Sequence, residues 1–378
     1  LVMLIQSHEA LGDAELSRRN VAAALDIHRR TLQLCERRAA EFPNDPAQHG
    51  LALAFSRLGD TQAEQGDLAA TIESYRRSLL IHEALVKKQP DNAAYRREMK
   101  VAYNWAGNFS GNPHFLNLGD SAAALQYYRQ GLVISEELAA ADPKNSTAKF
   151  DLGVSNEKMG DILSETKPAQ AAEFYRRALS ATGDLLIASP NQYRFLRRHT
   201  VFLWKRGAAL HKLGDRKGAL QELNQALENL RELIAKNPSN AELQGDLHAT
   251  LTALADVLTE TGERAKALDY GSQSLALAEK MVAANPADLY AQWRLAKSYS
   301  GLGQYHESPA SPPKSRLTER IANWKQARDW RQKALSVWDE WPKYAVSNSF
   351  DLTRREQAAR AVAQCQAMLE KLSAAPQR

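Results

Sequence analysis

The sequence predicts an all-α protein in which about seven antiparallel helix pairs stack into a right-handed superhelical solenoid, with a further helix closing the C-terminal end. Three recurring markers lead to this prediction. A small residue recurs before a turn, a leucine recurs on the helix that follows, and a proline recurs 11 residues after that leucine in six of seven copies. Three independent markers that stay in step over most of 378 residues indicate a repeat.

The small residue is called the anchor below, and successive anchors are 47, 48, 53, 47, 48 and 48 residues apart. An anchor without a bulky side chain lets two helices approach closely, and the leucine fills the space between one unit and the next. Proline ends a helix because it lacks an amide hydrogen. The anchors are Gly12, Gly59, Gly107, Gly160, Gly207, Ala255 and Gly303. The leucines are Leu32, Leu79, Leu132, Leu179, Leu227, Leu275 and Leu335. The prolines are Pro43, Pro90, Pro143, Pro190, Pro238 and Pro286.

These markers divide the chain into a solenoid over residues 1–346 and a C-terminal capping helix and tail over residues 347–378. The expected units are about 1–45, 46–92, 93–145, 146–192, 193–240, 241–288 and 289–346. Only 11 residues precede Gly12, so we expect a longer parent chain upstream.

Local signals refine single elements of this plan. The second helix of the first unit should span about residues 20–42, and the capping helix about residues 350–372. The third unit carries five extra residues in GNPHFLNLGD, which predicts a small projecting loop. The seventh unit carries a Ser- and Pro-rich insert after Gly303, which we expect to be mobile.

From anchor to leucine, the pattern resembles the tetratricopeptide repeat. The small and aromatic residues of that motif correspond here to Gly59, Thr71, Tyr75 and Ser78. The family repeat has 34 residues, whereas this period is 47 or 48, so both helices should be about seven residues longer. Helices of about 20 residues would be about 30 Å long.

A second resemblance suggests a context for the array. The stretches GNPHFLNLGDSAAAL and WKQARDWRQKALSVW are similar to long repeat arrays that follow the kinase domain in some bacterial serine/threonine protein kinases. The resemblance implies a signalling role and a parent that can be membrane-anchored. It leaves open whether the array lies in the cytoplasm or on the extracytoplasmic side.

Composition narrows the possible functions. The chain has a formal net charge of +5, and recurring arginine pairs such as Arg76-Arg77 are best explained as a solvated outer face, so no nucleic acid is expected as partner. No apolar run reaches the ~18 residues of a membrane span. The two cysteines lie at opposite ends and form no CxxC motif.

No catalytic motif is present in the sequence. Glycine-rich phosphate loops, HRD, DFG and GxSxG are all missing, and the nine histidines form no metal-binding pattern. We therefore expect a chain that is not an enzyme and takes no cofactor or metal. Asp13, Asp60, Asp161 and Asp256 follow their anchors directly. They indicate either an acidic strip on the inner face or polar ends of the first helices.

The concave groove of such an array is its usual binding surface, and first-helix residues spaced three or four apart before the anchor should line it. Aromatic and basic residues gather there, a composition typical of hot spots, although the aromatics could equally pack the helices. The candidates are Arg97, Asn104, Asn108, Arg194, Arg197, Trp204, Tyr290, Trp293 and Lys297.

The leading hypothesis is a protein-interaction scaffold or sensor region of a bacterial serine/threonine kinase-like protein, which binds a protein or peptide segment in its groove. The alternative is the ligand- or peptide-sensing region of a transcription regulator. A third hypothesis is a nucleic-acid-binding solenoid.

Overall fold

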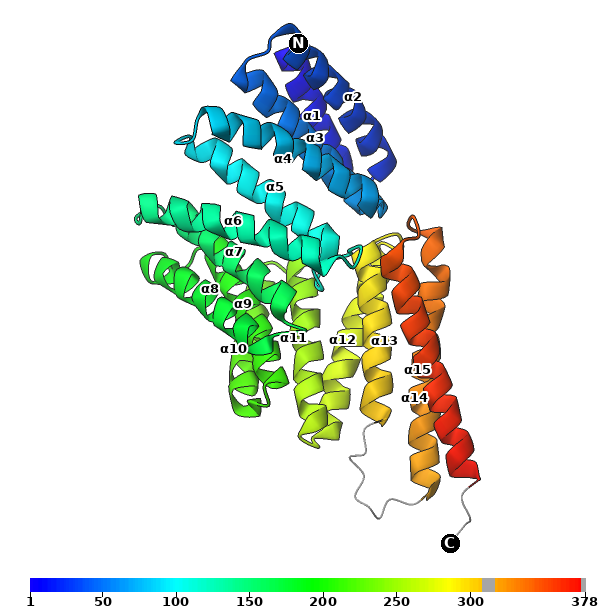
Figure 1. Ribbon diagram of the computed structural model, residues 1–378. Coiled ribbons are helices and arrows are strands. Elements are labelled where there is room, and N and C mark those ends of the chain that lie inside the picture. Colours follow the sequence, from blue (N-terminus) through cyan, green and yellow to red (C-terminus); the bar gives the residue numbers. More distant parts are fainter. Residues whose placement is uncertain (308–316, 375–378) are drawn as a thin grey trace. The chain divides into compact units, whose positions relative to one another are not determined.

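The computed structural model describes residues 1–307 and 317–374, and within these ranges the chain forms fifteen α-helices, a short 3-10 helix and no strand (Figure 1). Within each of its two compact units, consecutive helices pack against each other as antiparallel neighbours, which confirms the predicted all-α array of tetratricopeptide-like helix pairs. The chain divides into two compact units, Leu1–Glu165 and Thr166–Arg378, and each is described by itself.

The first unit contains seven helices. The first and second helices of successive pairs alternate along the chain, and each packs on the next. They are α1 (Val2–Ser17), α2 (Val21–Glu41), α3 (Asp45–Gln65), α4 (Leu68–Lys88), α5 (Ala93–Gly111), α6 (Ser121–Ala141) and α7 (Ser146–Leu163).

The second unit contains the remaining eight. In it the first helices also touch each other, because α11 contacts both α9 and α13. The helices are α8 (Pro168–Ala188), α9 (Tyr193–Lys212), α10 (Arg216–Lys236), α11 (Ala241–Glu260), α12 (Arg264–Ala284), α13 (Leu289–Glu307), α14 (Leu317–Glu340) and α15 (Ser349–Ser373). The 3-10 turn Trp341–Lys343 follows α14.

The turns within pairs follow from short sequence signals. Gly66 ends α3 with a positive φ of 80°, and Asp67 then caps α4 by accepting the amide hydrogen of Ala70 at 3.1 Å. The expected lengthening of the helices is confirmed, since α2, α3, α4 and α6 each have 21 residues.

Four anchor glycines, Gly12, Gly59, Gly107 and Gly207, each lie directly beneath one residue of the following helix. A Cβ on Gly59 would come within 3.0 Å of the Tyr75 ring, and one on Gly207 within 2.8 Å of Leu223. Gly12 and Gly107 are covered in the same way by His28 and Tyr128. We call this second-helix residue the covering residue. The anchor is small because the covering side chain occupies the place of its Cβ.

The insert of the third unit does not project, so the prediction of a projecting loop is wrong. Gly111 still belongs to α5, and Asn112, Leu116 and Asn117 are buried. Asn112 donates hydrogen bonds to the Tyr128 hydroxyl at 2.8 Å and to Asp161 at 3.1 Å. The extra residues fold back because these polar contacts fix them to α6 and α7.

The C-terminal helix forms where it was predicted, whereas part of the insert expected to be mobile forms helix. The final helix α15 packs on α14 and begins at a capping box formed by Asn348 and Asp351. Part of the Ser- and Pro-rich insert is helical, because α13 extends to Glu307 and α14 begins at Leu317. The rest of it, residues 308–316, lies outside the described residues.

Candidate binding surface

The first helices α9, α11 and α13 lie next to one another in the second unit and form one continuous surface, called the first-helix surface below. In the first unit, α5 and α7 make a similar contact. The predicted candidates all lie on α5, α9 and α13. Their burial and partners decide which of them a ligand could reach.

Arg97 and Arg197 occupy equivalent positions, ten residues before their anchors, and both are used to hold neighbouring helices together. Arg97 Nε lies 2.6 Å from Asp151 Oδ2, and Arg197 Nε lies 2.9 Å from Asp246 Oδ2. Both aspartates lie nine residues before the anchor of the next unit. The repeat therefore contains a recurring ion pair between successive first helices.

These two ion pairs are partly shielded from solvent. The Arg197 side chain is 18% exposed and also reaches Glu242 at 2.8 Å, while buried Lys100 lies 3.1 Å from Asp151. Burial raises the pKa of Asp246, and the Arg197 guanidinium opposes that rise. Both arginines thus have a structural role, whatever further role they have in binding.

Charge is distributed unequally between the two helices that Arg197 connects. Helix α9 carries six Lys or Arg residues and no Asp or Glu, whereas α11 carries four Asp or Glu residues and no Lys or Arg. Contacts between α9 and α11 include His211 with Glu260 at 3.5 Å, besides the Arg197 pairs. The opposite charges explain how two strongly charged helices can pack side by side.

Asn104 and Asn108 lie inside the first unit. Asn104 is 7% exposed, and Asn108 is 2% exposed and accepts a hydrogen bond from the Tyr128 hydroxyl at 2.9 Å. Their amides therefore face the packed helices and offer little surface to a ligand, contrary to the expected groove position.

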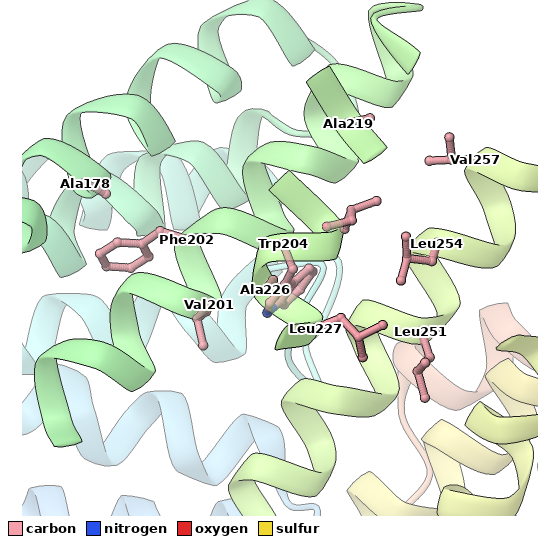
Figure 2. Packing of buried hydrophobic residues seen from close by; sticks show 11 residues of the cluster. Ala178, Val201, Phe202, Trp204, Ala219, Ala226, Leu227, Leu251, Leu254 and Val257 are labelled. Atoms are coloured by element: carbon pink, nitrogen blue, oxygen red, sulfur yellow. The ribbon is translucent and has the colours of Figure 1, made fainter. Parts of the chain in front are cut away.

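Trp204 is also buried, with 8% of the residue exposed. It belongs to an apolar cluster with Val201, Leu227, Leu251 and Leu254, and Figure 2 shows its indole lying among these side chains. The expectation that Trp204 presents its ring to a ligand is corrected, because α9, α10 and α11 close over it. Its packing role had been the competing interpretation.

The remaining four candidates keep accessible surface. Arg194 and Lys297 are exposed, and Tyr290 and Trp293 are half-buried. The Tyr290 and Trp293 rings are 6.1 Å apart, and Trp293 meets Phe350 of α15 edge-on at 5.4 Å. Trp293 therefore helps to seat the final helix while part of its ring stays open.

The recurring aspartates after the anchors have distinct environments. The covering residue Tyr75 donates its hydroxyl hydrogen to Asp60. Asp256 accepts one from Tyr305 at 2.9 Å, and burial raises its pKa. Asp161 is fully buried beside Asn112. Polar termination of the first helices is thus the better description for Asp161 and Asp256, whereas Asp13 and Asp60 stay exposed.

The described residues form no metal-binding cluster, and the cysteine thiols among them are buried. Within 1–307 and 317–374, no group of three His, Cys, Asp or Glu side chains could hold a metal ion. Both cysteines are buried, and burial raises the thiol pKa to about 11 for Cys35 and about 12 for Cys365. His248 and Ser298 are 2.8 Å apart, but both are buried and burial lowers the pKa of His248. Among the helices of these same ranges, none is long and apolar enough to cross a membrane.

Sequence reasoning missed the aspartate partners of Arg97 and Arg197. The signal was present, because an Asp nine residues before an anchor follows an Arg ten residues before the previous one in both cases. It was overlooked because the two residues are 54 and 49 positions apart.

Comparison with known proteins gives similarity of fold. A Rap protein complexed with competence and sporulation factor aligns with 98% of this chain and 99% of its own, with a TM-score of 0.48 and 12% identity. The apo form of RapI covers 85% of this chain and 99% of its own, with a TM-score of 0.45 and 15% identity. A tetratricopeptide repeat protein from Parabacteroides merdae ATCC 43184 covers 96% and 99%, with a TM-score of 0.41 and 12% identity. No protein-family model matches the sequence, and no curated protein matches it.

Proposed function

We propose that this chain is a non-catalytic interaction scaffold that holds a protein or peptide segment on the first-helix surface of its second unit. The observation that carries the proposal is the exposure of Arg194 and Lys297 on the same surface as half-buried Tyr290 and Trp293. Arginine and aromatic residues are enriched at protein interfaces, where they supply directed hydrogen bonds and large rigid contact area.

The proposed surface is smaller than the sequence pattern indicated. Asn104, Asn108 and Trp204 are buried, and Arg97 and Arg197 are engaged in ion pairs. A ligand would therefore contact the outer edges of α9 and α13, with the acidic helix α11 between them. An extended segment with a carboxylate for Arg194 or Lys297 suits this distribution of charge.

The proposed context is the repeat region of a bacterial serine/threonine kinase-like protein. Its support is the resemblance of the stretches at residues 111–125 and 324–338 to repeat arrays of such kinases. The sensing region of a transcription regulator is the alternative. Sequencing the gene upstream separates the two, because a kinase domain would carry HRD and DFG motifs and a regulator a DNA-binding domain.

Selection from a random peptide library displayed on phage tests the binding surface directly. The immobilised chain should enrich peptides whose affinity falls at least about tenfold in Arg194→Glu and Lys297→Glu, as expected for lost charge-assisted hydrogen bonds. Arg176→Glu, an exposed change on α8 with the same charge difference, is the matched control and should bind normally. Failure to enrich any peptide, or equal binding by all three variants, would contradict the proposal.

A further inference from the structure

A cluster of polar side chains, separate from the first-helix surface, lies in the first unit where α1 and α3 both contact α2. Asp13 lies on α1, His28 on α2 and Asp60 on α3. The His28 side chain is 2% exposed, and its Nε2 lies 3.6 Å from Asp13 Oδ1. The Asp13 side chain is 55% exposed, so it is the member of this pair that faces solvent.

The hydrogen bonds around His28 define its tautomer. Thr61 donates its single hydroxyl hydrogen to the carbonyl oxygen of Arg57 at 3.0 Å. Its oxygen is also 2.7 Å from His28 Nδ1, so Nδ1 must be the donor in that contact. Burial lowers the pKa of His28 and favours the neutral ring. Nε2 of neutral His28 is therefore an acceptor with a lone pair.

This lone pair has no donor among the residues that the structure describes. Nε2 is buried and without a hydrogen-bond partner there, and the polar atom it faces is a carboxylate oxygen, which is also an acceptor. Two acceptors at 3.6 Å repel each other unless a donor lies between or beside them. His28 Nε2 and Asp13 Oδ1 are both satisfied only when N–H or O–H groups of another molecule donate hydrogen bonds to them.

The charges nearby are predominantly negative. Arg57 neutralises Glu9, with 2.6 Å between Nη1 and Oε1, and its Nε is 3.8 Å from Asp13. The Asp60 residue as a whole is exposed, but its carboxyl group is shielded from water where it contacts the Tyr75 hydroxyl. This burial, with Asp13 and Glu64 acting in the same direction, raises the pKa of Asp60 to about 6.

The equivalent place in the second unit is arranged differently. Asp256 is half-buried, accepts the Tyr305 hydroxyl hydrogen and has cationic Lys297 as a neighbour. The first unit has instead a second aspartate, Asp13, close to Asp60. The surroundings of Asp256 thus already contain a cation, whereas those of Asp13 and Asp60 contain more carboxylates than cations.

We propose that Asp13 and His28, with Asp60 contributing negative charge, bind the lysine ammonium or arginine guanidinium of a partner segment. One N–H of the cation would donate to Nε2 and another to Oδ1 of Asp13. This inference rests on the proposed function as an interaction scaffold, and it names the cationic side chain that the first unit would recognise in a partner segment.

The experiment uses a fluorescein-labelled peptide, Arg-Gly-Arg-Gly-Arg, and its counterpart with citrulline in place of arginine. Fluorescence anisotropy should show binding of the arginine peptide that is at least about tenfold weaker in Asp13→Asn, because a charge-assisted hydrogen bond is lost. Citrulline should weaken binding similarly. Asp184→Asn removes one exposed carboxylate from α8 and serves as the control for net charge.

Nitrogen NMR of the histidine ring provides a readout that general electrostatics would not change. Binding of the arginine peptide should shift the His28 Nε2 resonance in the direction expected when a bare lone pair accepts a hydrogen bond. Equal affinity in Asp13→Asn and Asp184→Asn, or an unchanged Nε2 resonance at saturating peptide, would overturn the inference. Either result would leave the phage-selected peptides and the Arg194→Glu and Lys297→Glu tests untouched, so the two proposals fail separately.

Discussion

The two units connect their paired helices differently at one equivalent position. In the first unit the covering residues are His28, Tyr75 and Tyr128, and Tyr75 and Tyr128 donate to the polar residue that follows the anchor. In the second unit Ala208 follows the anchor Gly207, and the covering residue is Leu223, which is fully buried. The repeat tolerates either a hydrogen bond or an apolar contact there, provided that both residues change together.

The next helix pair of the second unit, α11 and α12, has no covering side chain of its own, and a residue of α13 takes its place. The covering position on α12 is Gly271, which leaves a space beside the helix pair. Tyr305 of α13 fills it, since a Cβ on Gly271 would come within 2.8 Å of its ring. The Tyr305 hydroxyl donates to Asp256, so a tyrosine from the following pair makes the bond that Tyr75 makes with Asp60. Asp60 and Asp256 therefore both accept a tyrosine hydroxyl hydrogen, but a different helix supplies the tyrosine in each case.

The largest expected effect concerns the apolar packing of the second unit. Leu227 is 4% exposed in the cluster around Trp204, so Leu227→Ala should cost about 2–5 kcal/mol of unfolding free energy. Leu179 is only partly buried against the same cluster, and Leu179→Ala should cost less. Urea denaturation followed by circular dichroism measures both. Leu213→Ala, at a leucine that is 45% exposed, is the control, and an effect of Leu227→Ala no larger than that of the control would refute this packing.

The polar interior of the first unit should make stability depend on pH. Burial lowers the pKa of His82 from 6.5 to about 4, so the unfolded chain binds the proton more tightly. The stability present above pH 6.5 should be lost as pH falls towards 4, with an upper limit of roughly 3 kcal/mol from this residue. Unfolding free energies of the native chain and His82→Leu, measured between pH 4 and 8, should converge on acidification. Parallel curves would show that His82 does not titrate in this way.

The ion pairs between first helices should have an intermediate effect. Arg197→Met leaves Asp246, whose side chain is 15% exposed, without its guanidinium partner and should cost about 2 kcal/mol. The double variant Arg197→Met/Asp246→Leu should recover most of this loss, because the stranded carboxylate is gone. A double-mutant cycle measures the coupling, and additive losses would show that the two side chains do not interact.

The smallest effect is expected for the hydrogen bond of a covering residue. Tyr75→Phe keeps the ring on Gly59 but removes the donor to Asp60, which should cost about 1–2 kcal/mol. The variant should also raise the pKa of Asp60 further, because this hydrogen bond favours the carboxylate. Carboxyl NMR titration checks the direction, and a lower pKa in Tyr75→Phe would contradict the assigned bond.

The periodic markers were sufficient to predict the helices and their pairing, because anchors, leucines and prolines act locally. The second helix expected at 20–42 is Val21–Glu41, and the final helix expected at 350–372 is Ser349–Ser373. It was less predictable which inner-face residues a ligand can reach, because their accessibility depends on side chains in other repeats. Arg97 could be assigned to a helix face from spacing alone, but its ion pair requires Asp151, 54 positions later.

One measurement tests most directly whether the inner-face residues divide into structural and ligand-binding sets. It compares Arg197→Gln with Arg194→Glu for both thermal stability and affinity for a peptide selected on the native chain. Arg197→Gln should lower the melting temperature and change the affinity little, whereas Arg194→Glu should weaken binding at least about tenfold and leave the melting temperature nearly unchanged. The reverse pattern, with Arg197→Gln abolishing binding at native stability and Arg194→Glu unfolding the array, would contradict the account.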